Sequence, residues 1–139
     1  MAQSDIIFPL NHTGDFKIGT GAPGAPLLRA ILTVPQNSST VTGQGRLTQA
    51  INPPLNFNSA FHGMVHVLVL PPGPARQVYA LQGTALPPLL GAPHVTQLLI
   101  TLEGIWGTKG TATYQYAVGS QIHDIKDAPV SVTWLLQEG

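Results

Sequence analysis

The chain has 139 residues, of which six are Lys or Arg and six are Asp or Glu, so its formal net charge is zero at pH 7. Charged residues make up 9% of the chain, whereas an average soluble protein has roughly 25%. Neutrality and the lack of a basic stripe in the sequence argue against nucleic-acid binding, and the absence of cysteine excludes disulfides and thiolate metal sites.

The length predicts a single domain over residues 1–139. The first residues do not combine a basic segment with a long apolar run, so we expect no secretory signal peptide. No apolar run reaches the roughly 18 residues of a membrane helix. These features predict a cytoplasmic protein without a membrane partner, with leaderless export as the alternative.

Proline, glycine and β-branched residues interrupt every helical pattern, so we predict strands only. The first strand is expected at residues 5–10, where Pro9 favours an edge position. A long linker follows, with a short strand around residues 16–18. Further strands are expected at residues 27–34, 40–50, 61–70 and 77–83.

The clearest element is a hairpin over residues 97–118, in which Gly107 and Gly110 allow a tight reversal. Period-two spacing predicts one buried face on each arm. The residues on these faces are Leu98, Ile100, Leu102, Trp106, Ala112, Tyr114 and Tyr116. A last strand over residues 130–136 places Val130, Val132 and Trp134 on one face.

About eight strands without a crossover helix predict an all-β fold, namely an antiparallel up-and-down β-barrel, with a β-sandwich as the alternative. The connections after the second, fourth and sixth strands are short, whereas the other four are long. In a meander the four long loops lie at one end. We expect a ligand or partner to bind at that loop-rich end.

Several polar and aromatic residues fall in or beside these predicted loops. They are His12, Asp15, Asn56, Phe57, His62, His94, His123 and Asp124, which we take as candidate ligand-binding residues. No catalytic motif and no metal-ligand spacing is present, so the prediction names no catalytic residue, metal site or cofactor. A small barrel enzyme that pairs the loop histidines with Asp15, Asp124 or Asp127 is the runner-up.

The aromatic residues Trp106, Tyr114, Tyr116 and Trp134 are expected to face the barrel lumen. Side chains of this kind fill most barrels of about eight strands. If the lumen is hollow, they would instead surround a small apolar ligand, which makes a ligand carrier a second alternative.

Some predicted strands are apolar on both faces. Leu99 and Ile105 lie opposite the face that carries Leu98, and Met64 and Leu68 lie opposite Val65. Because an outer apolar face is usually covered, we expect a homodimer through the sheet.

Three segments, FPLNHTGDFKIGTGAPGAPLLRAILTV, RLTQAINPPL and GTATYQY, resemble an uncharacterised bacterial family of small all-β proteins that is classed as a domain of unknown function. The resemblance implies a compact barrel and no established activity. The leading hypothesis is a non-enzymatic binding or interaction protein, and a carbohydrate-binding module is a third alternative.

Overall fold

The computed structural model of the chain describes residues 12–69 and 71–136. These residues form eight β-strands and no helix. The strands are β1 (His12–Ile18), β2 (Leu27–Val34), β3 (Thr40–Gln49), β4 (Leu55–Leu68), β5 (Arg76–Leu86), β6 (His94–Glu103), β7 (Lys109–Val118) and β8 (Gln121–Leu136). The described part of the chain therefore offers no helix that could span a bilayer.

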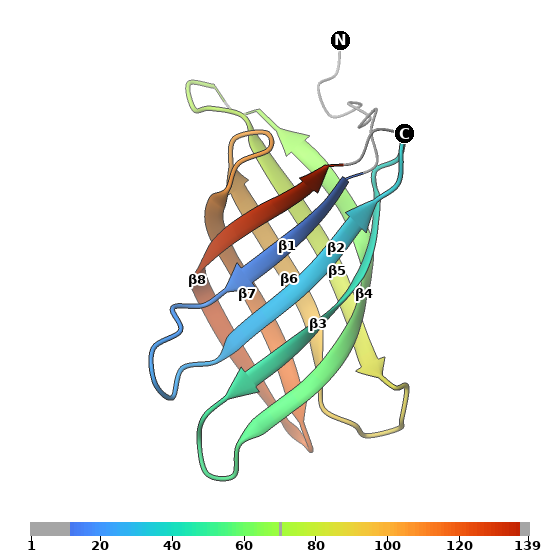
Figure 1. The fold of residues 1–139 in the computed structure, drawn as a ribbon, viewed down its shortest axis with the longest axis vertical. Helices are drawn as coiled ribbons and strands as arrows, with labels where there is room; N and C mark the ends of the chain where they lie inside the picture. The colour runs from blue at the N-terminus through green and yellow to red at the C-terminus, as the bar shows by residue number, and fades with distance from the viewer. Residues whose placement is uncertain (1–11, 70, 137–139) are drawn as a thin grey trace.

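Each strand pairs antiparallel with the next, and β8 returns to pair with β1, so the sheet closes into a barrel (Figure 1). At the closing seam His12 lies opposite Leu136 and Ile18 lies opposite Val130. The up-and-down barrel is confirmed, and the sandwich alternative is wrong. Closure leaves none of the eight strands as a free edge.

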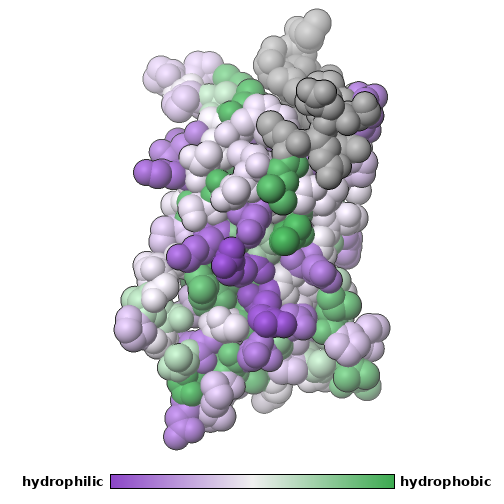
Figure 2. All heavy atoms as spheres, in the orientation of Figure 1, coloured by the Kyte–Doolittle hydropathy of each residue, from purple (hydrophilic) through white to green (hydrophobic). Residues whose placement is uncertain are grey.

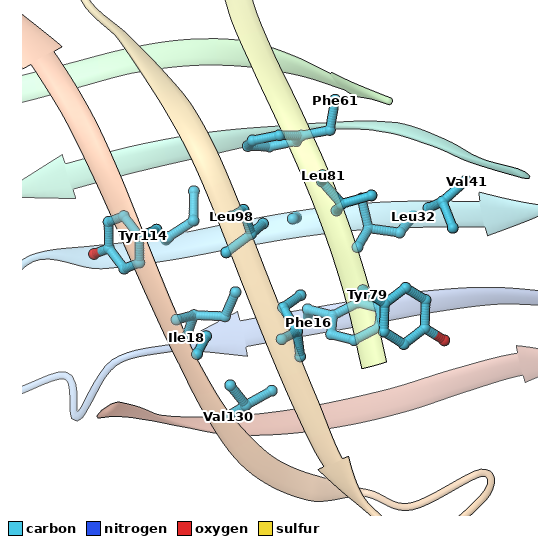
Figure 3. Close-up of a cluster of buried hydrophobic side chains, with 14 of the residues drawn as sticks. Phe16, Ile18, Leu32, Val41, Phe61, Tyr79, Leu81, Leu98, Tyr114 and Val130 are labelled. Carbon is cyan, nitrogen blue, oxygen red and sulfur yellow. The ribbon is translucent and has the colours of Figure 1, made fainter. Parts of the chain in front are cut away.

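Alternating side chains fill the barrel interior. On the predicted hairpin, Leu98, Ile100 and Leu102 are buried, as are Tyr114 and Tyr116 on the other arm. Figure 3 shows side chains from several strands meeting in this core, including Phe16 and Phe61. The period-two pattern therefore predicted the interior face correctly in the hairpin.

β6 comes close to β4 across Gly83 of β5. The backbone N–H of Val95 on β6 donates to Oγ of the buried Ser59 on β4, at 2.8 Å. A Cβ added to Gly83 on β5 would meet the carbonyl oxygen of Val95 and would lie 3.1 Å from Cε1 of Phe61. Glycine at this position therefore allows the close approach of three strands.

The first and last strands differ from the prediction. The strand expected at residues 5–10 lies outside the described residues, and β1 occupies the predicted linker. β8 begins at Gln121, inside a predicted loop, and a bulge shifts its register against β7 between Ala112 and Tyr114. The bulge changes which alternate residues of β8 face inward. The period-two pattern therefore does not continue along the strand, and the sequence did not reveal its first half.

These changes remove the expected contrast between a short-loop and a long-loop end. We call the end where β1 begins the upper end and the opposite end the lower end, as drawn in Figure 1. The upper end carries connections 35–39, 69–75 and 104–108, and the lower end carries 19–26, 50–54, 87–93 and 119–120. The expected row of four long lower loops is wrong, because longer strands take up much of the predicted loop sequence.

Candidate functional site

The candidate histidines do not share a site. His12 begins β1 at the upper end, whereas His94 and His123 lie near the starts of β6 and β8 at the lower end. The seven residues of β1 span about 20 Å. His62 lies exposed on the outer face of β4, where its register partners are Thr42 and Gln82. The described residues contain no group of three or more acidic or histidine side chains placed to hold a metal ion.

Aromatic rings close the upper end of the barrel. The buried His12 ring packs edge-on against Trp106 at 4.6 Å and against Trp134 at 5.6 Å between ring centroids. The indole N–H of Trp134 donates to the carbonyl oxygen of Gly107 at 3.0 Å. The buried Gln77 accepts from the backbone N–H of Trp106 at 2.9 Å. These contacts pack His12, Trp106 and Trp134 against one another as an aromatic plug.

A second aromatic group lies at the lower end. Tyr116 stacks on His123 with ring centroids 4.9 Å apart, and Phe57 packs against Tyr116 at 6.1 Å. The hydroxyl of Tyr116 donates to Oε1 of Gln49 at 3.4 Å. Asn56, the neighbour of Phe57 on β4, is exposed and does not join the group.

The lumen between these two groups is packed. Tyr114 and Tyr116 face inward as predicted, whereas Trp106 and Trp134 are only partly buried and belong to the upper plug. Burial raises the pKa values of both Tyr79 and Tyr114 above the ordinary value of tyrosine. Two grooves lie on the outer wall of the described part of the molecule. Buried side chains fill the interior of the described residues, so they show no hollow lumen for a small apolar ligand.

The larger outer groove, of about 620 Å³, crosses β5 to β8. Its walls carry side chains that lie opposite one another on adjacent strands, a set we call the glutamine row: Gln82, Gln97, Gln115 and Asp124. Leu99 and Ala80 are register partners on β6 and β5, and they line the same groove beside the glutamine row. Lys126 also lines this groove. Asp124 is the one candidate residue that this groove contains.

The other outer groove, of about 450 Å³, crosses β1 to β5 and contains the candidate Asp15. Arg29 on β2 and Arg46 on β3 lie directly opposite each other across its floor. Both side chains are exposed. Figure 2 shows hydrophilic residues gathered across the middle of the face formed by β1, β2 and β3.

Each arginine of this pair is oriented by a neighbour. Nη2 of Arg29 donates to Oδ2 of Asp15 at 3.3 Å, which is an ion pair across β1 and β2. Nε of Arg46 donates to Oδ1 of Asn58 at 3.3 Å. The two guanidinium groups are therefore fixed in one groove by groups on their outer sides.

The arginine pair belongs to a longer array of cations. Strand pairing aligns Lys109, Ser131, Lys17, Arg29, Arg46 and Asn58 in one outward-facing row, which we call the basic row. It contains four of the six Lys and Arg residues of the chain. The sequence suggests no basic stripe because these cations come from four separate segments.

The sequence profile of one family, the domain of unknown function DUF1842, matches residues 12–121. The chain belongs to this family. No curated protein matches it.

The match to DUF1842 covers β1 to β7 and ends at the first residue of β8. Since β8 pairs with both β7 and β1, the barrel of this DUF1842 member requires residues beyond the matched segment. Arg29, Arg46 and the three glutamines of the glutamine row lie inside the match, whereas Asp124 and Ser131 lie outside it.

Sequence reasoning selected Asp15 and Asp124, one from each groove, but missed the arginines and glutamines beside them. Period-two spacing places Arg29 and Arg46 on outward faces. It does not give the register between strands, which decides that these two residues are opposite each other. The sequence does contain one signal for a basic site. Basic residues are few in this chain, yet each of three successive strands carries one.

Proposed function

We propose that the protein is a non-enzymatic binding module that holds an anionic group of its ligand between Arg29 and Arg46 on the outer wall of the barrel. The observation that carries the proposal is the direct pairing of these two arginines across β2 and β3. The packed lumen supports a site on the outer wall.

Two like charges directly opposite on adjacent strands destabilise a sheet. Because the chain has only six basic residues, we do not expect two of them to face each other on adjacent strands by chance. An anion between the two guanidinium groups would turn the repulsion into two attractive contacts. Functional sites often retain arrangements that cost stability in the absence of a ligand.

The geometry around the pair suits a carboxylate, phosphate or sulfate group. A guanidinium presents several N–H donors in a planar fork, which matches two oxygens of such a group. Asp15 and Asn58 restrain Arg29 and Arg46 from outside, which reduces the entropy lost when a ligand binds. Gln44 lines the same groove and offers a further amide donor.

The proposal is tested by titrating inorganic phosphate, sulfate and acetate at low ionic strength and following backbone amide NMR signals. We expect the largest shifts on β2 and β3 around Arg29 and Arg46. The substitution Arg46→Gln should weaken binding about two- to fivefold, the value of one exposed charge contact. The control, Lys126→Gln, removes an exposed cation outside the basic row and should leave binding unchanged. Equal effects of the two substitutions, or no shifts at all, would contradict the proposal.

The glutamine row favours a second candidate, a neutral oligosaccharide. Its amides offer donors and acceptors on adjacent strands, which are spaced about 4.8 Å apart, close to the length of one sugar unit. A glycan array should then show neutral glycans whose signal is lost in Gln97→Leu and kept in Gln44→Leu. An array without neutral hits removes this candidate.

We also propose that a second copy of the chain covers the apolar band of the outer wall, which consists of Met64, Leu68, Leu99 and Ile105, each 41–47% exposed. The band lies on β4, β6 and the connection after β6. Gln77 pairs with Leu102, so the next positions, Arg76 and Glu103, are neighbours at its upper edge. A two-fold axis parallel to the strands would place each of these charges opposite its counterion on the partner, and zero net charge adds no repulsion.

A further inference from the structure

The basic row continues beyond the arginine pair in one direction only. From Arg29, the register leads to Lys17 on β1, Ser131 on β8 and Lys109 on β7. In the other direction it leads through Arg46 to Asn58 on β4. All these side chains are exposed. With strands about 4.8 Å apart, the path from Lys109 to Arg46 is about 20 Å long.

A third outer groove, of about 330 Å³, follows part of this path and contains Lys17, Lys109 and Ser131. It also contains Glu103, so this groove, like the arginine groove with Asp15, holds two cations and one carboxylate. The wall of the barrel therefore carries a track that curves with the sheet from β7 to β3 and has the two paired arginines at one end. A single small anion would use only the arginine end of this track.

We propose that the track binds a linear acidic oligosaccharide, with one carboxylate between Arg29 and Arg46 and further sugar units extending over Lys17 and Ser131 towards Lys109. This inference rests on the proposed function, because the same arginine pair anchors the ligand. Successive sugar units are about as long as the distance between strands, so each strand of the track meets about one unit.

The mixture of side chains favours a sugar acid over a polyphosphate or a nucleic acid. Ser131, Asn58 and Gln44 are neutral groups that can both donate and accept hydrogen bonds, which suits sugar hydroxyls. A phosphate chain offers acceptors only. Four cations in a neutral chain also give little long-range attraction for a nucleic acid. No aromatic residue belongs to the track for bases to stack on.

The test is isothermal titration calorimetry of the full chain at low ionic strength with galacturonic acid, its trimer and its hexamer. We expect the hexamer to bind at least about tenfold more tightly than the monomer, because each added exposed contact contributes roughly two- to fivefold. Lys17→Gln and Lys109→Gln should each weaken hexamer binding by such a factor and leave monomer binding unchanged. Arg46→Gln should weaken both, and Lys126→Gln, which removes an exposed cation outside the track, should change neither.

The outcomes separate the inference from the proposed function. If the monomer binds through Arg46 but the hexamer binds no more tightly, the acidic-oligosaccharide inference is wrong and the anion site stands. If no anion binds or Lys126→Gln is as damaging as Arg46→Gln, both are wrong. Tighter binding of tripolyphosphate or of a six-nucleotide oligothymidylate than of the hexamer would also overturn the inference. Thermal unfolding of each variant checks that the barrel is intact.

Discussion

The hydroxyl groups of Tyr79 and Tyr114 point to opposite ends of the same packed interior, as Figure 3 shows. Both side chains are 1% exposed. The Tyr79 hydroxyl accepts a hydrogen bond from Nε2 of Gln77 at 2.8 Å. The Tyr114 hydroxyl has no hydrogen-bond partner among the described residues. The two tyrosines therefore offer a matched pair for measuring the value of a buried hydrogen bond.

Tyr79→Phe should lower the free energy of unfolding by about 1–2 kcal/mol, because it leaves a donor of the buried Gln77 without its acceptor. Tyr114→Phe should be neutral or slightly stabilising, since it removes a buried hydroxyl without a described partner. Urea unfolding of both variants measures the difference. Equal losses in the two variants would mean that the Tyr114 hydroxyl is satisfied in solution.

Stability should fall at alkaline pH. In the unfolded chain tyrosine loses its proton near its ordinary pKa of 10.0, whereas burial raises the pKa values of Tyr79 and Tyr114 in the folded state. Above pH 10 the folded state therefore binds more protons than the unfolded state, and the free energy of unfolding falls with a limiting slope of about 1.4 kcal/mol per pH unit for each tyrosine.

Urea titrations between pH 8 and pH 11 measure this loss. Stability should be nearly constant up to about pH 9, because both states keep the hydroxyl protons there. The double variant Tyr79→Phe, Tyr114→Phe should show a flatter decline above pH 10. An unchanged slope in that variant would assign the decline to other groups.

Gly83→Ala should lower stability by about 3 kcal/mol or more, because the new methyl group would collide with the carbonyl oxygen of Val95 and crowd Phe61. The adjacent outward residue provides the control, since Thr84→Ala should stay within about 0.5 kcal/mol of the parent chain. Thermal unfolding compares the two variants. A Gly83→Ala variant as stable as Thr84→Ala would show that β4, β5 and β6 can separate at little cost.

Arg46→Gln should raise the free energy of unfolding by a few tenths of a kcal/mol in the absence of anions, because it removes the repulsion from Arg29. The gain should shrink as sodium chloride screens the charges. Thermal unfolding at low and high salt measures both effects. A loss of stability that is independent of salt would indicate that the hydrogen bond from Arg46 to Asn58 outweighs the repulsion.

Light scattering at micromolar concentration should give the mass of a dimer for the parent chain. Leu99→Lys, placed in the apolar band, should give the mass of a monomer, because a buried unpaired charge opposes association. Ile31→Lys is the control, since Ile31 is similarly exposed at 49% but lies outside the band on β2. A monomer mass for the parent chain contradicts the dimer.

The barrel could be predicted from the sequence wherever strict alternation marks one buried face. Leu98, Ile100 and Leu102 show this alternation, and all three are buried. Prediction failed at β8, where the bulge moves the inward positions from His123 and Ile125 to Ala128 and Val130. Pro129 within that stretch also resembles a loop residue, although it pairs with Thr111 inside the strand.

The candidate site could be predicted only in fragments. A single sequence gives the face on which Asp15 or Asp124 lies, but the neighbours of each residue depend on the register of the whole barrel. The register places Arg46 beside Arg29 and Gln115 beside Asp124. The upper aromatic plug was missed for the same reason, because His12 and Trp106 are far apart in the sequence.

The pairing of His12 with Leu136 at the closing seam has a consequence for engineering. Because the described ends of the chain are neighbouring strand partners, a short linker can join them, and the chain can be opened at another connection without breaking any ladder. A circular permutant opened within 87–93 keeps both the arginine pair and the glutamine row. It would place new termini at the opposite end of the barrel, where a fused reporter stays away from the aromatic plug.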